Sequence, residues 1–288
     1  VILEVYNSDF AVEHKDDNSP LTLADKRSHE IIVNDLKQPI TTNSNEYLVN
    51  NPSLPILSEE GKDIPYNGRK GWEYFWLVDP LDGTKEFIKR NGEFTVNIAL
   101  IHRDKPVLGC IYIPAQDTFY FSAVNLGAYM LANSKIITGD LSIKTLLDIS
   151  QRLPLSAHTK KAHSHTNQCT SKKNTPLTII GSRSHATKEL SEFVDKTKER
   201  CGEVEFISAG SSLKFCLVAE GKADLYPRFG PTMEWDTAAG QAIVEQAEGR
   251  VVDMQTKEPL RYNKNTLVNP FFVVSGQGFP FTQLEHSW

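Results

Sequence analysis

Two aspartates, Asp79 and Asp82, stand three residues apart in the stretch WLVDPLDGTKEF, which covers residues 76–87. The apolar residues before the first aspartate predict a buried strand. The second aspartate and Gly83 predict a turn, after which Thr84 begins a short helical pattern. Carboxylate oxygens suit a hard divalent cation, and the free N–H groups of a helix N-terminus suit a phosphate. The stretch therefore contains the parts that metal-assisted phosphoryl chemistry needs.

The same residues also fit an ordinary chain reversal. Pro80 fixes φ within the turn, Gly83 lets the backbone bend, and Asp-Pro and Asp-Gly pairs are frequent in turns that have no ligand. The spacing alone leaves both interpretations open, so the rest of the chain has to decide between them.

A further acidic position follows another predicted strand. Glu59 and Glu60 come directly after the short apolar segment 54–58. Paired acids at a strand end are usually solvated surface. If this strand lies beside the one that ends at Asp79, however, the two strand ends converge, and a carboxylate from each can share a cation.

Two more acids stand where helices are predicted to begin. Asp25 follows Thr22 by three residues, which is the spacing of a capping box. Asp236 opens the helical pattern that follows Trp235, although Thr237 can also cap that helix. For both aspartates a helix-start carboxylate is the alternative to a role in catalysis or metal binding.

Two basic residues lie in the second half of the chain. Lys214 stands inside a helix that Ser211 or Ser212 begins, and Arg228 follows Tyr226-Pro227. A solvated helix face and a plain surface position are the default interpretations of these residues. Either side chain can instead reach a phosphate.

Periodicity divides the chain into two halves joined by a polar segment. Alternating apolar residues in 95–101 and 107–112 predict antiparallel strands, and from Leu177 strand and helix patterns alternate as in an α/β unit. We expect three parts: an N-terminal α+β half (1–132) with most of the acidic candidates, a polar insertion or connection (133–176), and a C-terminal α/β half (177–288) that supplies Asp236.

The polar segment 133–176 contains residue types that bind metals, His158, His163, His165 and Cys169. Their spacing fits no zinc pattern, and the segment lacks flanking apolar periodicity. We therefore expect a surface excursion and no metal site there.

Composition narrows the class of protein. Of the 288 residues, 40% are hydrophobic and 23% charged, as in soluble globular proteins, and the net charge of -5 offers no basic surface to nucleic acid. No signal peptide is visible, and no apolar run approaches the roughly 18 residues of a membrane span.

Four cysteines without a C-x-x-C pair predict reduced thiols. We expect a cytoplasmic protein, with peripheral attachment to the inner membrane as the alternative, and further residues before Val1.

Taken together, the acidic segments resemble the inositol monophosphatase superfamily of magnesium-dependent, lithium-sensitive phosphatases. The segments that carry this resemblance are 57–60 (LSEE), 79–84 (DPLDGT) and 235–240 (WDTAAG). Within the superfamily, residues 76–100, 182–185 and 210–232 resemble the bacterial CysQ-type branch of 3'(2'),5'-bisphosphate nucleotidases. The resemblance covers nearly the whole chain and departs most at 133–176.

The resemblance implies a fold of combined α/β and α+β type. This is the layered αβαβα sandwich of the inositol monophosphatase and fructose-1,6-bisphosphatase type. It also implies the ligands of two Mg²⁺ ions. Glu59, Asp79 and the carbonyl of Leu81 would hold one ion, and Asp79, Asp82 and Asp236 would hold the other. Since only the carbonyl of Leu81 is needed, its side chain is expected to be replaceable.

The catalytic and substrate-binding roles follow from the same resemblance. Asp25, beside Glu59, would bind a third, weaker ion or take a proton from the attacking water, which Thr84 would orient. Lys214 and Arg228 would hold the second phosphate of the substrate. The full substrate-binding set is Leu81, Asp82, Gly83, Thr84, His185, Lys214, Arg228 and Asp236.

The implied reaction is hydrolysis of adenosine 3',5'-bisphosphate (PAP) to AMP and phosphate, a step linked to sulfate assimilation. The 5'-phosphosulfate analogue, PAPS, is a further candidate substrate. The alternatives are an inositol phosphate or fructose-1,6-bisphosphate as substrate, and a non-catalytic nucleotide-binding protein. The oligomeric state stays open.

Overall fold

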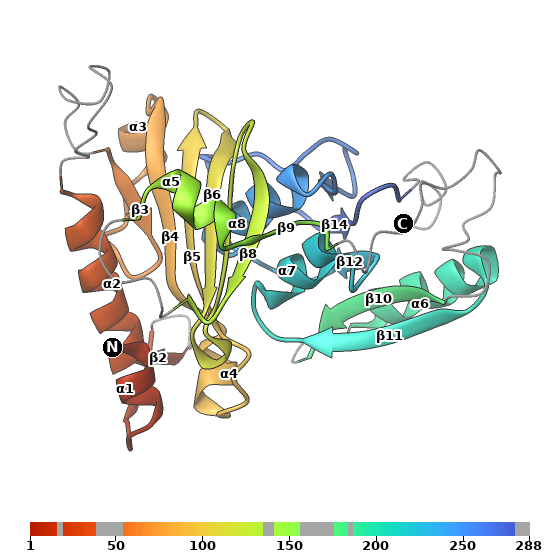
Figure 1. The fold of residues 1–288 in the computed structure, drawn as a ribbon, viewed down its shortest axis with the longest axis horizontal. Helices are drawn as coiled ribbons and strands as arrows, with labels where there is room; N and C mark the ends of the chain where they lie inside the picture. Colours follow the sequence, from red (N-terminus) through yellow and green to blue (C-terminus); the bar gives the residue numbers. More distant parts are fainter. Residues whose placement is uncertain (16–19, 39–53, 135–140, 156–175, 184–186, 280–288) are drawn as a thin grey trace.

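Figure 1 shows the fold in a computed structural model, which describes residues 1–15, 20–38, 54–134, 141–155, 176–183 and 187–279. Two sheets follow one another along the chain, and the helices lie between them and outside both of them. A small antiparallel hairpin, β1 (Val12–His14) and β2 (Pro20–Thr22), precedes the first sheet.

The larger sheet contains seven strands in sequence order. Neighbouring strands run antiparallel, except that β3 and β4 are parallel. Along β5 buried and partly exposed residues alternate strictly, which is the pattern that predicted this strand. The strands are β3 (Ile56–Ser58), β4 (Tyr74–Asp82), β5 (Thr95–His102), β6 (Lys105–Ile113), β7 (Thr118–Ala123), β8 (Gly127–Ala132) and β9 (Gln151–Arg152).

The smaller sheet contains five strands in the order β11-β10-β12-β14-β13. β10 runs parallel to β11 and β12, whereas β14 runs antiparallel to both of its neighbours. The strands are β10 (Leu177–Ser182), β11 (Val204–Ala209), β12 (Leu225–Arg228), β13 (Arg250–Asp253) and β14 (Phe272–Ser275).

The helices complete five layers (Figure 1). α1 and α2 cover the outer face of the larger sheet, α7 and α8 lie between the two sheets, and α6 packs on the smaller sheet. The predicted αβαβα sandwich is therefore confirmed. The helices are α1 (Ile2–Tyr6), α2 (Leu23–Leu36), α3 (Tyr66–Arg69), α4 (Thr84–Ile88), α5 (Ile143–Asp148), α6 (Lys188–Cys201), α7 (Leu213–Glu220) and α8 (Glu234–Gln246), with a short 3₁₀ turn, η1 (Pro114–Gln116).

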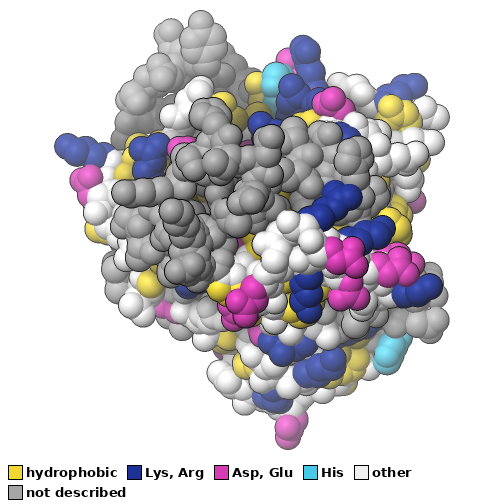
Figure 2. Space-filling view, turned by 90° about the vertical axis from the view of Figure 1, so that its right-hand side faces the viewer, with side chains coloured by type: hydrophobic (Ala, Val, Ile, Leu, Met, Phe, Trp, Pro, Cys, Tyr) yellow, Lys and Arg dark blue, Asp and Glu magenta, His cyan; other side chains and the backbone are white. Residues whose placement is uncertain are grey.

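The position of each helix explains its composition. α6 faces solvent on one side and buries only Leu190, Phe193 and Thr197, and positive and negative side chains lie next to one another over this end of the molecule (Figure 2). α8 lies between two sheets and buries most of its length, including Ala239 and Ile243. A helix that is covered on several sides needs small or apolar residues around its circumference.

α8 approaches the larger sheet very closely at Gly109 of β6. A Cβ atom added there would lie 2.5 Å from the carbonyl oxygen of Ala239 and 2.8 Å from the Cβ of Ala242. Since neither contact is possible without a backbone shift, glycine is required for α8 to lie at this depth. The start of α8 carries Asp236, so this packing also bears on the acidic cluster.

The segment 133–176 contributes to the larger sheet where it is described. It contains α5 and β9, and β9 pairs with β8 at the edge of the sheet. Its histidines and Cys169 lie outside the described residues. The three-part division of the chain stays a prediction.

The cysteines differ from the expectation of four reduced thiols. Cys110 and Cys216 are free, but Cys201 takes part in a disulfide, so the expectation is wrong for that residue. None of the helices in the described ranges combines the length and the apolar character that a membrane crossing requires.

Replacing Gly109 by alanine is expected to lower the free energy of unfolding by about 1–3 kcal/mol, because the added methyl group overpacks the interface between β6 and α8. Denaturant unfolding followed by circular dichroism measures the change. Gly71→Ala is the matched control, since a Cβ at Gly71 meets nothing within 4 Å. Equal losses for the two variants would contradict the close approach of α8.

Candidate active site

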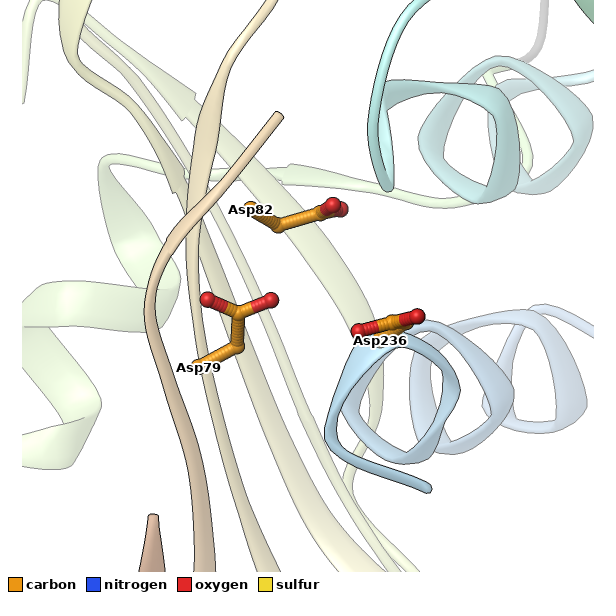
Figure 3. Close-up of side chains that lie close together, drawn as sticks. All are labelled: Asp79, Asp82 and Asp236. Carbon is orange, nitrogen blue, oxygen red and sulfur yellow. The ribbon is translucent and has the colours of Figure 1, made fainter. Parts of the chain in front are cut away.

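Three aspartates converge where the two halves of the chain meet. Asp79 and Asp82 come from the end of β4, and Asp236 comes from the first turn of α8 (Figure 3). One carboxylate oxygen of each lies within 4.8 Å of the other two. The structure thus brings together three of the acids that the sequence proposed as metal ligands.

An irregularity in β4 lets both of its aspartates face the same way. In a regular strand, residues three apart point to opposite faces of the sheet. Here the pairing of β4 with β5 shifts register between Asp79 and Asp82, as at a β-bulge. Pro80 lies in this interval, and the Asp79 carboxylate accepts a hydrogen bond from Leu81 N–H at 3.0 Å. Local turn chemistry therefore aims the two carboxylates at one point.

The turn after β4 depends on Gly83, which has φ of +88°. A side chain at this φ would be strained, and its Cβ would also lie 3.0 Å from the Cβ of Ser211. α4 begins at the next residue, Thr84. The order strand, turn and helix is the one that the sequence predicted.

Asp236 performs the capping role that was its alternative interpretation. Its Oδ2 accepts a hydrogen bond from Met233 N–H at 2.8 Å. Its carboxylate nevertheless faces Asp79 and Asp82. Capping and membership of the acidic cluster are therefore compatible in this residue.

The electrostatics of the cluster fit a divalent cation. Burial raises the pKa values of Asp79 and Asp236 well above the ordinary range, and the neighbouring carboxylates raise them further. Burial also raises the pKa of Asp82, although Lys214 opposes this shift. Among the ion pairs of the described residues, none includes these three aspartates. Because three carboxylates at such short range repel one another, an oxygen-binding cation such as Mg²⁺ suits the site.

Glu59 lies beside this cluster but outside its tight group. Its Oε1 lies 2.8 Å from Lys15 Nζ, and the same ammonium lies 2.5 Å from Glu60 Oε1. Burial opposes the charge of Lys15, but the two glutamates outweigh it and hold the Lys15 pKa above its ordinary value. Lys15 is not among the site residues predicted from the sequence. No local pattern connects it with Glu59, which lies 44 residues further along the chain.

Asp25 makes two kinds of contact. Its Oδ2 accepts hydrogen bonds from the N–H and the hydroxyl of Thr22, at 2.7 and 2.6 Å, and this confirms the predicted capping box. Its Oδ1 lies 3.1 Å from the Thr84 hydroxyl. Burial raises the pKa of Asp25. The two residues expected to handle the attacking water are thus in direct contact.

The carbonyl oxygen of Leu81 faces the site, since it lies 3.3 Å from the Thr84 hydroxyl. The Leu81 side chain is buried in a cluster with Phe87 and Phe94. Truncating this leucine would leave a cavity and lower stability. That its side chain is replaceable for the chemistry of the site stays a prediction.

A cavity of about 310 Å³ lies over the three aspartates. Lys214 and Arg228 line it from the C-terminal half, from α7 and β12. Other residues that the sequence proposed also line it, namely Glu59, Leu81, Gly83 and Thr84. His185 lies outside the described residues, so its role stays a prediction.

Lys214 and Arg228 are not ordinary surface cations, unlike the exposed Lys85, which also lines the cavity. Lys214 is only 4% exposed, its Nζ donates to the carbonyl of Ser211 at 2.6 Å, and burial lowers its pKa to about 8. The solvated-face interpretation of Lys214 is therefore wrong. Arg228 donates through Nη2 to the Pro231 carbonyl, while its buried Nε has no hydrogen-bond partner in the described part of the chain.

Comparisons with known proteins give matches over most of the chain. The model of the inositol monophosphatase family matches residues 1–277. The chain is 42% identical over 278 residues to the 3'(2'),5'-bisphosphate nucleotidase CysQ of Escherichia coli strain K12, covering 95% of this chain and 93% of that protein. It is 41% identical over 277 residues to the CysQ of Salmonella typhimurium, with the same coverage.

Solved structures show the same fold. The crystal structure of CysQ from Bacteroides thetaiotaomicron, a bacterial member of the inositol monophosphatase family, matches with a TM-score of 0.77 and 43% identity, covering 96% of this chain and 92% of the other. An IMPase of Thermotoga maritima matches with a TM-score of 0.66 and 19% identity, covering 99% and 90%. At that identity the second match supports the fold alone.

Asp236→Asn tests whether the cluster binds a cation. The amide oxygen can still cap α8, while one of three repelling charges is removed. We therefore expect the metal-free variant to be more stable than the wild type by about 0.5–2 kcal/mol, and to bind Mg²⁺ about tenfold more weakly or worse. Thermal unfolding in EDTA and calorimetric Mg²⁺ titration measure the two effects.

The matched control is Asp195→Asn, which changes an exposed aspartate of α6. It should leave Mg²⁺ binding unchanged and should not stabilise the metal-free protein. If Asp236→Asn behaves like this control, the three aspartates do not form a cation site.

Proposed function

The chain belongs to the inositol monophosphatase family, and from this premise we propose that it is a 3'(2'),5'-bisphosphate nucleotidase, a phosphoric monoester hydrolase. It removes the 3'-phosphate of adenosine 3',5'-bisphosphate (PAP) and releases AMP and phosphate. Relatives with this name match the chain over most of its length, which supports the substrate. The observation that carries the proposal is the converging group of Asp79, Asp82 and Asp236, which lines one cavity with Lys214 and Arg228.

Magnesium is the proposed cofactor, because the donors are all oxygen atoms and the buried carboxylates are mutually repelling. Asp79, Asp82 and Asp236 would hold one ion. Asp79, Glu59 and the carbonyl of Leu81 would hold a second, and a third, weaker ion would lie near Asp25. When bound, Mg²⁺ polarises the phosphate and lowers the pKa of the attacking water.

The protein's own groups would orient the water and the phosphate. The Thr84 hydroxyl donates to Asp25 at 3.1 Å, so the Thr84 oxygen can accept a hydrogen bond from the attacking water, and Asp25 can receive the proton. The N–H groups of Gly83 and Thr84, at the start of α4, would hold the oxygens of the scissile phosphate.

The second phosphate of the substrate would bind to the cations of the C-terminal half. Arg228 has a buried Nε–H without a partner in the described residues, and a phosphate oxygen would satisfy it. Lys214 is held by the Ser211 carbonyl at the same cavity. A 5'-phosphosulfate would carry a similar negative charge, so PAPS fits the same groups. His185 remains the predicted contact to the nucleoside.

Other phosphomonoesters are the main competing substrates. The proposed metal site of three aspartates would act on the scissile phosphate alone. It therefore suits an inositol phosphate or fructose-1,6-bisphosphate equally well. Lys214 and Arg228, which line the cavity, favour a substrate with a second anionic group. A non-catalytic nucleotide-binding protein would have no need of three converging aspartates beside the Thr84–Asp25 pair. The expected cytoplasmic location stays a prediction.

A panel of phosphate-release assays tests the function. With saturating Mg²⁺, we expect kcat/KM for PAP to exceed that for inositol 1-phosphate by about tenfold or more, since charge-assisted hydrogen bonds to the second phosphate contribute about 1.5–3 kcal/mol. Fructose-1,6-bisphosphate also carries a second phosphate, so its rate measures how much the nucleoside adds. Chelation of Mg²⁺ should abolish release from all three. Comparable rates on inositol 1-phosphate would refute the nucleotide preference. Retained turnover without Mg²⁺ would refute the metal site.

Arg228→Met tests the second-phosphate contact separately. The variant should raise KM for PAP by about 10- to 100-fold, because a charge-assisted contact to the 5'-phosphate is lost. It should leave KM for adenosine 3'-monophosphate, which lacks that phosphate, unchanged. Arg103→Met, at an arginine outside the cavity whose side chain is 72% exposed, is the control for loss of positive charge. An equal loss on both substrates would show that Arg228 acts elsewhere.

A further inference from the structure

Asp82 is held by hydrogen bonds from both halves of the chain. Its Oδ2 accepts from the N–H of Ser212 at 2.6 Å, from the Ser212 hydroxyl at 2.8 Å and, more weakly, from Asn97 Nδ2 at 3.5 Å. Ser212 precedes α7, and Asn97 lies in β5. No hydrogen bond from the described residues reaches Oδ1 of Asp82. One oxygen of this carboxylate is therefore fixed, and the other is left for a cation.

The orientation of the Asn97 amide is fixed from behind. Thr95 Oγ1 donates to Asn97 Oδ1 at 2.9 Å, and Ser211 Oγ donates to Thr95 Oγ1 at 3.1 Å. Because the amide oxygen accepts the threonine proton, the NH₂ group of Asn97 must point to the other side, where it donates to Ser212 Oγ at 2.9 Å. Thr95 and Asn97 are 0% and 1% exposed, so water does not compete for these contacts.

Ser212 also connects Asp82 to the helix that carries the third aspartate. Its hydroxyl oxygen lies 2.8 Å from Asp82 Oδ2 and 2.7 Å from the carbonyl oxygen of Asp236. The hydroxyl has one proton, which it donates to one of these oxygens at a time. In both arrangements the same serine contacts the N-terminal half and the start of α8.

The sheet supports this network. In the register of β4 and β5, Asp79 lies opposite Asn97, and Asp82 lies opposite Thr95. The residues that hold Asp82 therefore belong to the strand next to it, at the same level as the two aspartates. Because β5 is a strand inside the sheet, its residues can restrict rotation of the Asp82 carboxylate.

We propose that Thr95, Asn97 and Ser212 are positioning residues that set the Mg²⁺ affinity of the cluster by fixing the Asp82 carboxylate through Oδ2. The proposal rests on the Mg²⁺ site of the proposed function. Partners that hold a metal-ligating carboxylate typically change metal affinity by about 10- to 100-fold when they are removed. A purely structural role for the same network would change stability and leave metal affinity unaltered.

Thr95→Val is the sharpest test, because it keeps the shape of the side chain and removes only the hydroxyl that orients Asn97. The matched control is Thr197→Val, since Thr197 is also 0% exposed and its hydroxyl donates to Phe193 O within α6. Calorimetric titration of the metal-free proteins with Mg²⁺ gives the affinity, and thermal unfolding in EDTA gives the stability. We expect Thr95→Val to bind Mg²⁺ about tenfold more weakly than Thr197→Val, at similar stability in EDTA.

Thr95→Ser separates orientation from packing. It keeps the hydroxyl and loses a buried methyl group, so it should be less stable than the wild type and should retain wild-type Mg²⁺ affinity. Ser212→Ala, which removes the hydroxyl that contacts Asp82, should lose affinity as Thr95→Val does. Retained affinity in both Thr95→Val and Ser212→Ala would overturn the proposal. So would a loss of affinity in Thr95→Ser equal to that in Thr95→Val.

The wild type provides the reference for the proposed function itself. If it binds Mg²⁺ and the variants bind equally well, the positioning role fails and the phosphatase assignment stands. If the wild type does not bind Mg²⁺, the proposed function fails, and the positioning role falls with it.

Discussion

The convergence of three like charges at one point is the constraint on which the rest of the structure depends. Asp79, Asp82 and Asp236 repel one another and are desolvated, so their convergence opposes folding. Apolar packing has to hold them in place. α8 is fixed between the sheets by residues such as Ile243 and by its close approach to Gly109, and a shifted register in β4 aims the other two carboxylates at its first turn.

The same constraint explains why the cavity lies between the two halves. No single strand or helix supplies all three carboxylates, because β4 carries two of them and α8 the third. Of the basic residues that line the cavity, Lys214 and Arg228 come from α7 and β12, whereas Lys85 comes from α4. The three carboxylates therefore come together only when α8 packs on the larger sheet, and the cavity is completed by residues of α7 and β12.

The features that could be predicted from the sequence are those that depend on residues close together in the chain. The alternation in β5, the capping box of Thr22 and Asp25 and the turn after β4 follow from neighbouring residues, and each is present. The contact of Lys15 with Glu59 joins residues 44 positions apart, and no local pattern records it. Burial of the Leu81 side chain and of Lys214 likewise depends on which surfaces the completed fold covers. The resemblance to a family carried the ligand set, which spacing alone left undecided.

The short segment from Ser212 to Lys214, at the start of α7, contacts both the acidic cluster and the cavity. Ser212 contacts Asp82 and the carbonyl of Asp236, and Lys214, two residues later, lines the cavity and interacts electrostatically with Asp82. A displacement of the start of α7 would therefore move Asp82, a proposed metal ligand, and Lys214, a proposed phosphate-binding cation, together. Under the proposed function, this linkage couples recognition of the rest of the substrate to the geometry of the reacting group. Substitutions in α7 should thus alter metal affinity and substrate preference in concert, whereas substitutions confined to β12 should alter preference alone.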